Sequence, residues 1–144
     1  MTSMWNPPDK DFFDTVWKIV RQIPEGKVST YGQIASMIPP YEGTDPDAHQ
    51  RLSPRWVGTA MRKVEDDDVP WQRVINSQGK ISLPDQSGDK QRRLLEGEGV
   101  TFGKSAKVDL TEFGWEGPDD EWLDEHNLLP PNLFLKKPKQ KPLF

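Results

Sequence analysis

Two helix-start signals constrain the fold of this chain more than any other feature of its sequence. Thr30 and Gln33 fit a capping box, which predicts the start of a short helix. Ser53 followed by Pro54 predicts the start of a second helix, because serine caps helix starts and proline is favoured at the first helical position. Two short helices in this order indicate a helix-turn-helix, although the connection between them is unusually long.

Apolar residues at helical spacing predict a further helix before these two, over residues 9–23. After them, an extended segment over 69–75, a turn at 76–79 and a short strand over 80–82 predict a small hairpin or wing. The other expected elements are a helix over 31–38, a loop over 39–52, a helix over 54–64, a helix capped by Asp85 or Ser87 that runs to Gly97, and a strand over 100–102. The predicted fold class is mainly α with a small β hairpin, in a winged helix-turn-helix arrangement.

A change in composition predicts how the chain is organised. After about residue 104 the sequence becomes rich in acids and prolines, so we expect a domain over 1–104 and a C-terminal extension over 105–144. Residues 108–115 are expected to pack back on the domain, and residues 117–144 to form a flexible or partner-binding tail. The lysine-rich stretch 136–141 fits a nuclear import signal, an extra nucleic-acid contact or a solubilising tail, and the last is favoured.

Composition also excludes several classes of function. The sequence has no cysteine, which excludes disulfides, thiolate metal sites and a cysteine nucleophile. Its two histidines, His49 and His126, are far apart, so neither a metal nor another cofactor is expected. No stretch approaches the ~20 apolar residues of a membrane span, and no secretory signal is visible at Met1–Asp11. We therefore expect an intracellular protein with no membrane partner.

The net charge of −4 leaves a nucleic-acid partner open, because the distribution of charge matters more than its sum. Residues 49–64 contain no acid. The bases within this segment are Arg51, Arg55, Arg62 and Lys63. The sequence therefore predicts a basic face on the second helix of the helix-turn-helix.

Four separated motifs, over 28–35, 55–61, 69–77 and 94–100, together resemble the DNA-binding domain of O6-alkylguanine-DNA alkyltransferases over about residues 9–103. In those enzymes the segment that matches residues 70–74 reads Pro-Cys-His-Arg-Val, and its cysteine accepts the alkyl group. Here Trp71 stands at the cysteine position and Gln72 at the histidine position, so the thiolate and its proton acceptor are both absent.

A tryptophan at this position is typical of the alkyltransferase-like proteins, which bind alkylated guanine without repairing it. The chain is most similar to that family. Its members usually carry Pro-Trp-His-Arg-Val, so Gln72 departs from the pattern even there. The histidine's proton chemistry is not needed for binding, and the departure therefore affects local hydrogen bonding to Glu98.

The resemblance implies a role for each motif residue in a winged-helix DNA-binding domain. Arg55 would fill the gap that an extruded nucleotide leaves in the base stack, and Tyr31 would crowd the adjacent phosphate. Trp71 would line the pocket with a flat apolar surface, and Gly58 would let its helix approach the minor groove. The implied phosphate contacts are Ser29, Thr30, Gln33 and Ser77, and the other pocket residues are Met61, Pro70, Leu83, Pro84 and Asp85. The implied structural network, in place of a catalytic relay, consists of Gln72, Arg73 and Glu98.

The function implied by the resemblance is recognition of O6-alkylguanine in double-stranded DNA by nucleotide flipping. A monomer without enzymatic activity would flag the lesion for nucleotide excision repair proteins, in the cytoplasm of a prokaryote or the nucleus of a eukaryote. One alternative is a winged-helix transcription regulator that binds unmodified DNA, which predicts little preference for alkylated guanine. The others are a hydrolase or glycosylase that uses a carboxylate and water, and an interaction module built on the acidic extension.

Overall fold

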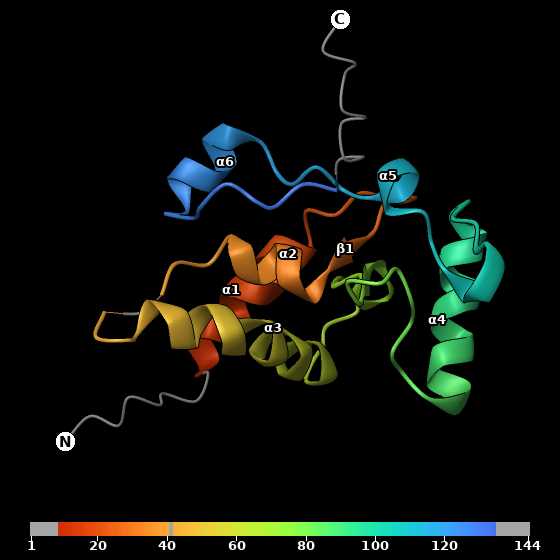
Figure 1. The fold of residues 1–144 in the computed structure, drawn as a ribbon, viewed down its shortest axis with the longest axis horizontal. Helices are drawn as coiled ribbons and strands as arrows, with labels where there is room; N and C mark the ends of the chain where they lie inside the picture. Colours follow the sequence, from red (N-terminus) through yellow and green to blue (C-terminus); the bar gives the residue numbers. More distant parts are fainter. Residues whose placement is uncertain (1–8, 41, 135–144) are drawn as a thin grey trace, which may run out of the picture.

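The computed structural model describes residues 9–40 and 42–134. In chain order its elements are α1 (Lys10–Val20), β1 (Ser29–Thr30), α2 (Tyr31–Ser36), α3 (Pro46–Arg62), the 3-10 helix η1 (Trp71–Arg73), β2 (Val74–Ile75), α4 (Asp85–Gly97), the 3-10 helix η2 (Lys104–Ala106), α5 (Leu110–Phe113) and α6 (Asp120–Glu125). Figure 1 shows α2 between α3 on one side and the C-terminal segment with α6 on the other. The mainly helical class that the sequence predicts is confirmed.

Helices α1 and α2 begin where their sequence signals predict. The side chain of Asp9 accepts a hydrogen bond from the Phe12 amide at 3.0 Å and caps α1. Thr30 caps α2 in the same way, with its Oγ1 3.0 Å from the Gln33 amide nitrogen. The apolar face of α1 is buried, as its periodicity predicts, and the helix ends at Val20, before the expected end at residue 23.

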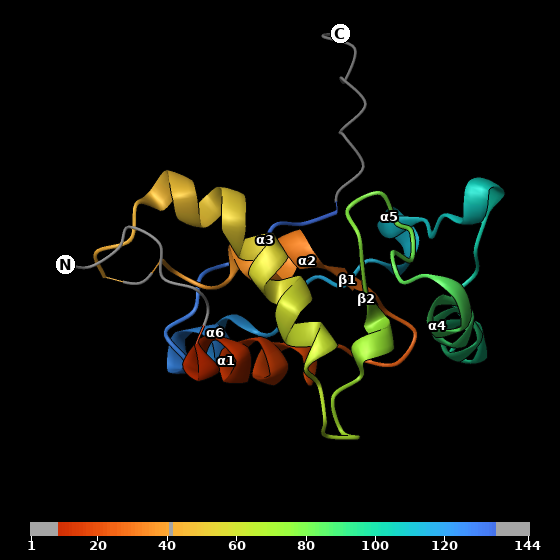
Figure 2. The same ribbon diagram turned by 90° about the horizontal axis from the view of Figure 1, so that it is seen from below.

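Helix α3 begins earlier than predicted, so the interpretation of residues 46–52 as loop is wrong. Asp45 and Pro46 repeat the same combination of a capping side chain and a proline in the first turn, and the carboxylate of Asp45 accepts from the Asp47 amide at 3.4 Å. Pro54 lies inside the helix, where it lacks the amide hydrogen of a normal helical residue. Figure 2 shows that α3 changes direction between its two halves.

The small sheet pairs distant segments, so the predicted hairpin is wrong. Strand β1 runs parallel to β2, with Ser29 opposite Val74 and Thr30 opposite Ile75. The Trp71–Arg73 segment, expected to be extended, is a 3-10 helix, and the described residues 80–82 are not in a strand. The predicted turn at 76–79 is present, because the Asn76 side chain accepts from the Gln78 and Lys80 amides at 3.0 Å.

The end of the described chain packs on the core. Leu123 and Leu128 are buried in the main hydrophobic cluster, so residues 117–134 differ from the loose tail that their composition suggested. Val108 and Trp115 are also buried, which confirms that residues 108–115 pack back on the domain. The predicted strand over 100–102 is reduced to a single bridge, and neither Asp85 nor Ser87 caps α4. The lysine-rich stretch 136–141 lies outside the described residues.

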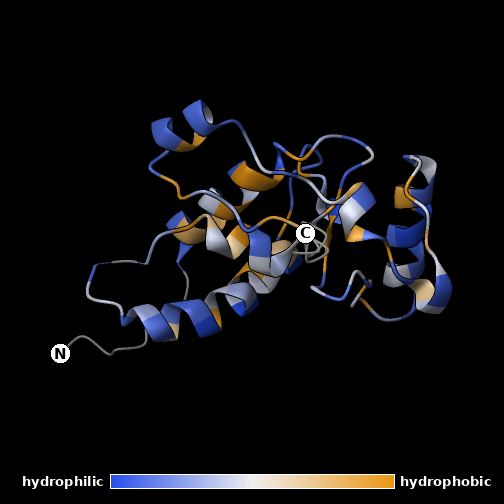
Figure 3. Cartoon of the chain, turned by 45° about the horizontal axis from the view of Figure 1, so that its top comes forward, coloured by the Kyte–Doolittle hydropathy of each residue, from blue (hydrophilic) through white to orange (hydrophobic). Residues whose placement is uncertain are grey.

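Two buried clusters form the core. The larger joins α1, α2, α3 and the C-terminal segment, and the smaller lies around Val28, Ile75 and Leu95, beside the sheet and α4. Figure 3 shows that hydrophobic residues on the helices lie beside hydrophilic ones, as expected for helices with one buried side. No described helix is both long and apolar enough to cross a membrane. The candidate site lies between α3 and α4.

Candidate nucleic-acid interface

An open groove of about 1250 Å³ separates α3 from α4. Its lining comes from the start of α2, the second half of α3, η1, the turn after β2 and the start of α4. Residues expected from the sequence that line it are Tyr31, Arg55, Gly58, Met61, Trp71, Ser77, Leu83 and Pro84. The fold therefore brings one set of predicted site residues from four separated segments into one concavity.

The two aromatic residues of the groove lie next to opposite ends of the small parallel sheet. Tyr31 begins α2 directly after β1, and Trp71 begins η1 directly before β2. Both side chains are half-buried, so each is held by the fold and still presents a surface. The hydroxyl of Tyr31 lies 3.2 Å from Oγ of Ser82, which ties Tyr31 to the loop on the α4 side.

Helix α3 supplies the cations of the groove. Arg55 is exposed, and no ion pair involves it among the residues described. Arg62 donates from Nη2 to Oγ1 of Thr59 at 3.2 Å, which fixes its guanidinium along the helix. A Cβ added at Gly58 would meet only the Arg62 side chain, at 3.8 Å. Internal packing therefore does not require glycine at this position. The absence of a side chain here would allow an external molecule to approach the helix backbone closely.

Behind the groove, Gln72 and Arg73 converge on Glu98. Arg73 donates from Nε to Oε1 of Glu98 at 2.9 Å, and from Nη1 to the Ile23 carbonyl at 2.8 Å. Gln72 donates to Oε2 of Glu98 at 2.8 Å, and the Gly26 amide donates to Oε1 at 3.0 Å. The structure thus joins the three residues that the sequence assigned to a structural network.

The surroundings of Glu98 keep its carboxylate charged. Burial alone raises the pKa of Glu98, but hydrogen bonds from Arg73, Gly26 and Gln72, together with the positive charge of Arg73, hold that pKa below its ordinary value. The side chains of Arg73 and Glu98 are only 17% and 9% exposed, so this ion pair is largely shielded from solvent. A carboxylate that is ionised at neutral pH and bonded at both oxygens braces the fold and is poorly suited to proton transfer.

Gln91 holds the same segment from α4. Its Nε2 donates to the carbonyl oxygens of Gln72 and Val74, at 3.1 and 2.9 Å, and its side chain is buried. The backbone that follows Trp71 is therefore held by Gln91 as well as by Glu98. Sequence reasoning did not find Gln91, because a polar residue in a helix gives no signal of burial. It also did not assign to the site other groove residues, namely Gly32, Pro54, Thr59, Val64, Val74, Asn76, Ser82 and Ser87, whereas Arg62 had been expected on the basic face.

Three expected phosphate contacts are instead buried. Ser29, Thr30 and Gln33 are 0%, 2% and 1% exposed, and their side chains form hydrogen bonds within the protein. Gln33 is bonded to the C-terminal segment, and none of the three side chains is exposed at the surface for contact with phosphate. Asp85, at the start of α4, is exposed and is not part of the groove lining.

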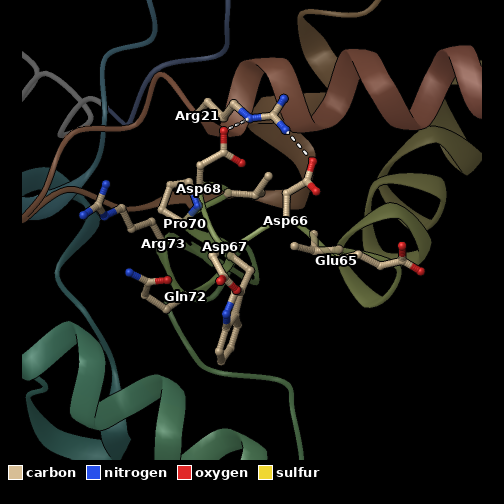
Figure 4. Close-up of a pocket in the computed structure, with 11 residues that line it drawn as sticks. Arg21, Glu65, Asp66, Asp67, Asp68, Pro70, Gln72 and Arg73 are labelled. Atoms are coloured by element: carbon tan, nitrogen blue, oxygen red, sulfur yellow. Dashed lines mark hydrogen bonds and ion pairs between the residues drawn. The ribbon is translucent and has the colours of Figure 1, made fainter.

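Pro70 lines a different cavity, of about 410 Å³, that shares Val64 and Trp71 with the groove. Acidic residues border this cavity, and Figure 4 shows Arg21 between Asp66 and Asp68. The Arg21 guanidinium is 3.2 Å from Asp66 and 3.0 Å from Asp68. The acidic segment is thereby tied to α1. In the part of the chain that the structure describes, no group of three potential ligands is arranged to hold a metal ion.

The basic helix, aromatic residues and open groove define a small helical DNA-binding domain. The family model for the 6-O-methylguanine DNA methyltransferase DNA-binding domain matches residues 11–100. A DNA base-flipping protein from Vibrio parahaemolyticus is 41% identical over 106 residues, covering 73% of this chain and 96% of the relative. Alkyltransferase-like protein 1 of Schizosaccharomyces pombe is 41% identical over 113 residues, covering 74% and 95%.

A solved structure of S. pombe Atl1 with damaged DNA containing O6-carboxymethylguanine is also similar. It superposes with a TM-score of 0.59 at 37% identity, over 75% of this chain and 97% of Atl1. The chain therefore belongs to the alkyltransferase-like proteins, within the family of 6-O-methylguanine DNA methyltransferase DNA-binding domains.

Proposed function

We propose that this protein binds O6-alkylguanine in duplex DNA by turning the damaged nucleotide out of the base stack and into the groove, without transferring the alkyl group. The observation that carries the proposal is the convergence of Tyr31, Arg55 and Trp71 in one groove. The names of the relatives, a base-flipping protein and an alkyltransferase-like protein, and the Atl1 complex with damaged DNA support the same reading.

Each of the three residues suits one part of nucleotide flipping. Arg55 is exposed on a helix that can approach closely at Gly58, and a planar guanidinium can stack between bases while it bonds the orphaned partner base. Tyr31, on the other side of the groove, presses on the backbone of the flipped nucleotide. The half-buried indole of Trp71 offers a flat apolar surface for guanine and its alkyl group.

Phosphate contact falls to groups that the structure leaves at the surface. Ser77 is exposed at the edge of the groove, and the bases of α3 and its end, Arg51, Arg62 and Lys63, are exposed as well. Such contacts fix the position of the duplex without reading sequence, and they make binding sensitive to salt. Met61, Leu83 and Pro84 complete the pocket wall.

The chemistry of the site argues against alkyl transfer. An indole does not become an alkyl-accepting anion at neutral pH as a thiolate does, and no cysteine occurs elsewhere in the sequence. The Gln72 amide does not titrate and is bonded to Glu98, so it cannot draw a proton from a nucleophile. Neither a cofactor nor a metal is part of the proposed function.

A lesion that is bound but not repaired must be removed by other proteins. We therefore propose that the complex, with the protein acting as a monomer where the DNA is, marks the site for nucleotide excision repair, which removes the damaged strand around a lesion. The bound protein and the distorted duplex together form the signal. Family resemblance supports this step.

The test compares duplexes that differ by one O6-methylguanine, titrated at fixed salt. We expect at least about a tenfold lower Kd for the damaged duplex, since specific and non-specific binding differ by several kcal/mol. Equal affinities would instead support a transcription regulator. Tritium in the methyl group should stay in the DNA after incubation, and its transfer to protein or release with the base would overturn the non-enzymatic proposal.

A further inference from the structure

Residues 108–134, here called the C-terminal strap, hold the segment that carries Tyr31 at both of its ends. Before β1, the Trp115 amide donates to the Val28 carbonyl at 2.8 Å. After α2, the Leu129 amide donates to the Met37 carbonyl, also at 2.8 Å. Figure 1 shows the strap passing α2 on the side opposite α3. The strap is therefore hydrogen-bonded to the chain on both sides of α2.

Gln33 connects α2 to two points of the strap, one near its start and one near its end. Its Nε2 donates to the carbonyl oxygens of Trp115 and Asn132, at 2.7 and 2.9 Å, so both amide hydrogens are used. Its Oε1 accepts from Oγ of Ser29 at 2.6 Å. The side chain is 1% exposed. One buried amide thus joins β1, α2 and two strap residues that lie far apart in the sequence.

Ser36 completes the connection one helical turn later. Its Oγ donates to the Gln33 carbonyl at 2.6 Å and accepts from the Asn132 amide at 3.0 Å. Gly114 lets the strap fold back on itself here, because a Cβ would overlap the Leu110 carbonyl and the Phe134 ring. The strap is therefore closely packed at the point where it bonds to α2.

Helix α2 depends for its position on contacts with the rest of the fold, which are its packing on α1 and α3 and its bonds to the strap. It spans only Tyr31–Ser36, and a helix so short is not stable by itself in water. Tyr31, its first residue, lies two positions before Gln33 and lines the groove. We propose that Gln33 is a positioning residue through which the strap holds Tyr31 for nucleotide flipping. This inference rests on the proposed function, and the strap lies beyond residue 100, where the family match ends.

The proposal predicts different effects on affinity for undamaged DNA and on affinity for damaged DNA. A residue that only stabilises the fold would change both affinities together. Contacts of the α3 cations with phosphate need no fixed Tyr31, so affinity for undamaged DNA should be nearly unaffected by loss of the Gln33 connection. Flipping requires Tyr31 in place and should be impaired. The preference for damaged over undamaged duplex is therefore the quantity that the strap controls.

The experiment uses the full chain with the substitution Gln33→Leu, which keeps the volume and removes the hydrogen bonds of the amide. The probe is a duplex with one O6-methylguanine beside 2-aminopurine, whose fluorescence rises when its neighbour is flipped out. We expect the ratio of the Kd for undamaged duplex to the Kd for damaged duplex to fall at least about fivefold, with a weaker fluorescence rise. A change of about fivefold is the size expected from the loss of one net hydrogen-bond contribution. Ile19→Ala in α1 is the control: it loses buried packing without touching the connection.

If Gln33→Leu does not fold, Ser36→Ala serves in its place, because it removes only the hydroxyl between Gln33 and Asn132. An unchanged Kd ratio and fluorescence rise in the folded variant, with only a lower Tm, would overturn the inference and leave the proposed function standing. The same change in Ile19→Ala would also overturn it, since general loss of stability would then suffice. A wild-type protein without preference for the damaged duplex would overturn the proposed function and the inference with it.

Discussion

Gln72 donates a hydrogen bond of 2.8 Å from Nε2 to Oε2 of Glu98, across 26 residues of sequence. In the enzymes that the chain resembles, a histidine that serves proton transfer matches Gln72. Here the amide bonds to a carboxylate that Arg73 and the Gly26 amide also hold. These hydrogen bonds form a brace between the segment that carries Trp71 and the end of α4.

The brace predicts how stability depends on pH. The folded pKa of Glu98 lies below its unfolded value of about 4.5, so ionised Glu98 stabilises the fold above that pH, and the contribution is lost as pH falls through the folded pKa. Glu98→Gln should lower the free energy of unfolding at pH 7 by about 1–3 kcal/mol, since buried partners lose hydrogen bonds. The difference in free energy of unfolding between Glu98→Gln and wild type should become smaller as the pH is lowered toward 3.

Urea denaturation at several pH values between 7 and 3 measures this. The matched control is Glu96→Gln on the same helix, whose exposed pairing with Arg92 at 3.5 Å should contribute less than about 0.5 kcal/mol. A constant gap between wild type and Glu98→Gln at every pH would contradict the assignment.

Arg55 and Arg51 offer a comparison within one helix. Both are exposed on α3, but only Arg55 lines the groove. Arg55→Ala should weaken binding to the O6-methylguanine duplex about 10- to 100-fold and reduce lesion preference, because the gap in the stack is left unfilled. Arg51→Ala should weaken damaged and undamaged duplexes equally, with a salt slope shallower by about one. Titrations at several salt concentrations distinguish the two, and equal behaviour of the variants would contradict the role of Arg55.

Trp71 should contribute to lesion binding by stacking. Trp71→Ala should raise the Kd for the O6-methylguanine duplex by about 5- to 100-fold, the range for loss of one base–aromatic stack, with a smaller effect on undamaged DNA. Trp17→Ala is the control, because Trp17 lies on α1 outside the groove and donates to the Ala60 carbonyl at 2.8 Å. It should lower Tm and leave lesion preference intact. Loss of preference in both variants would show that stability, not stacking, is responsible.

Two glycines of α4 should respond in opposite ways to alanine. A Cβ at Gly88 would overlap the Leu83 carbonyl, whereas a Cβ at Gly97 meets nothing within 4 Å. Gly88→Ala should therefore displace the Leu83 wall of the groove, lower Tm and weaken lesion binding. Gly97→Ala should be neutral or stabilise the helix by up to about 1 kcal/mol. Thermal denaturation and lesion titration of the pair check this, and a neutral Gly88→Ala would contradict the close packing.

Local signals in the sequence predicted those elements whose causes are local. The caps at Asp9 and Thr30 are side-chain bonds to amides within three residues, and the periodicity of α1 follows from its buried face. The start of α3 was misplaced because Asp45-Pro46 and Ser53-Pro54 carry the same kind of signal. Packing of the first turns of α3 on the core makes Asp45-Pro46 the start of the helix. His49 and Ser53 are buried in this packing, but as polar residues they do not indicate burial in the sequence.

The candidate site was predictable to the extent that family motifs name its residues. Tyr31, Arg55 and Trp71 indeed share a groove. Gln33 could not be placed, because a glutamine at the third position of a helix looks the same whether it faces phosphate or a distant carbonyl. Acids and prolines in residues 117–134 suggested a tail, while two leucines, Leu123 and Leu128, are enough to anchor it in the core.

The bond between Gln33 and Asn132 spans 99 residues. During synthesis, Gln33 therefore leaves the ribosome long before the carbonyl that completes its pairing exists. Helix α2 cannot reach its final surroundings while the chain that follows α4 is still missing. Contacts between residues this far apart in sequence also slow folding. The chain loses the entropy of closing a long loop before the contact contributes favourable free energy. The proposed preference for damaged DNA therefore depends on a contact that forms only after residue 132 has been made.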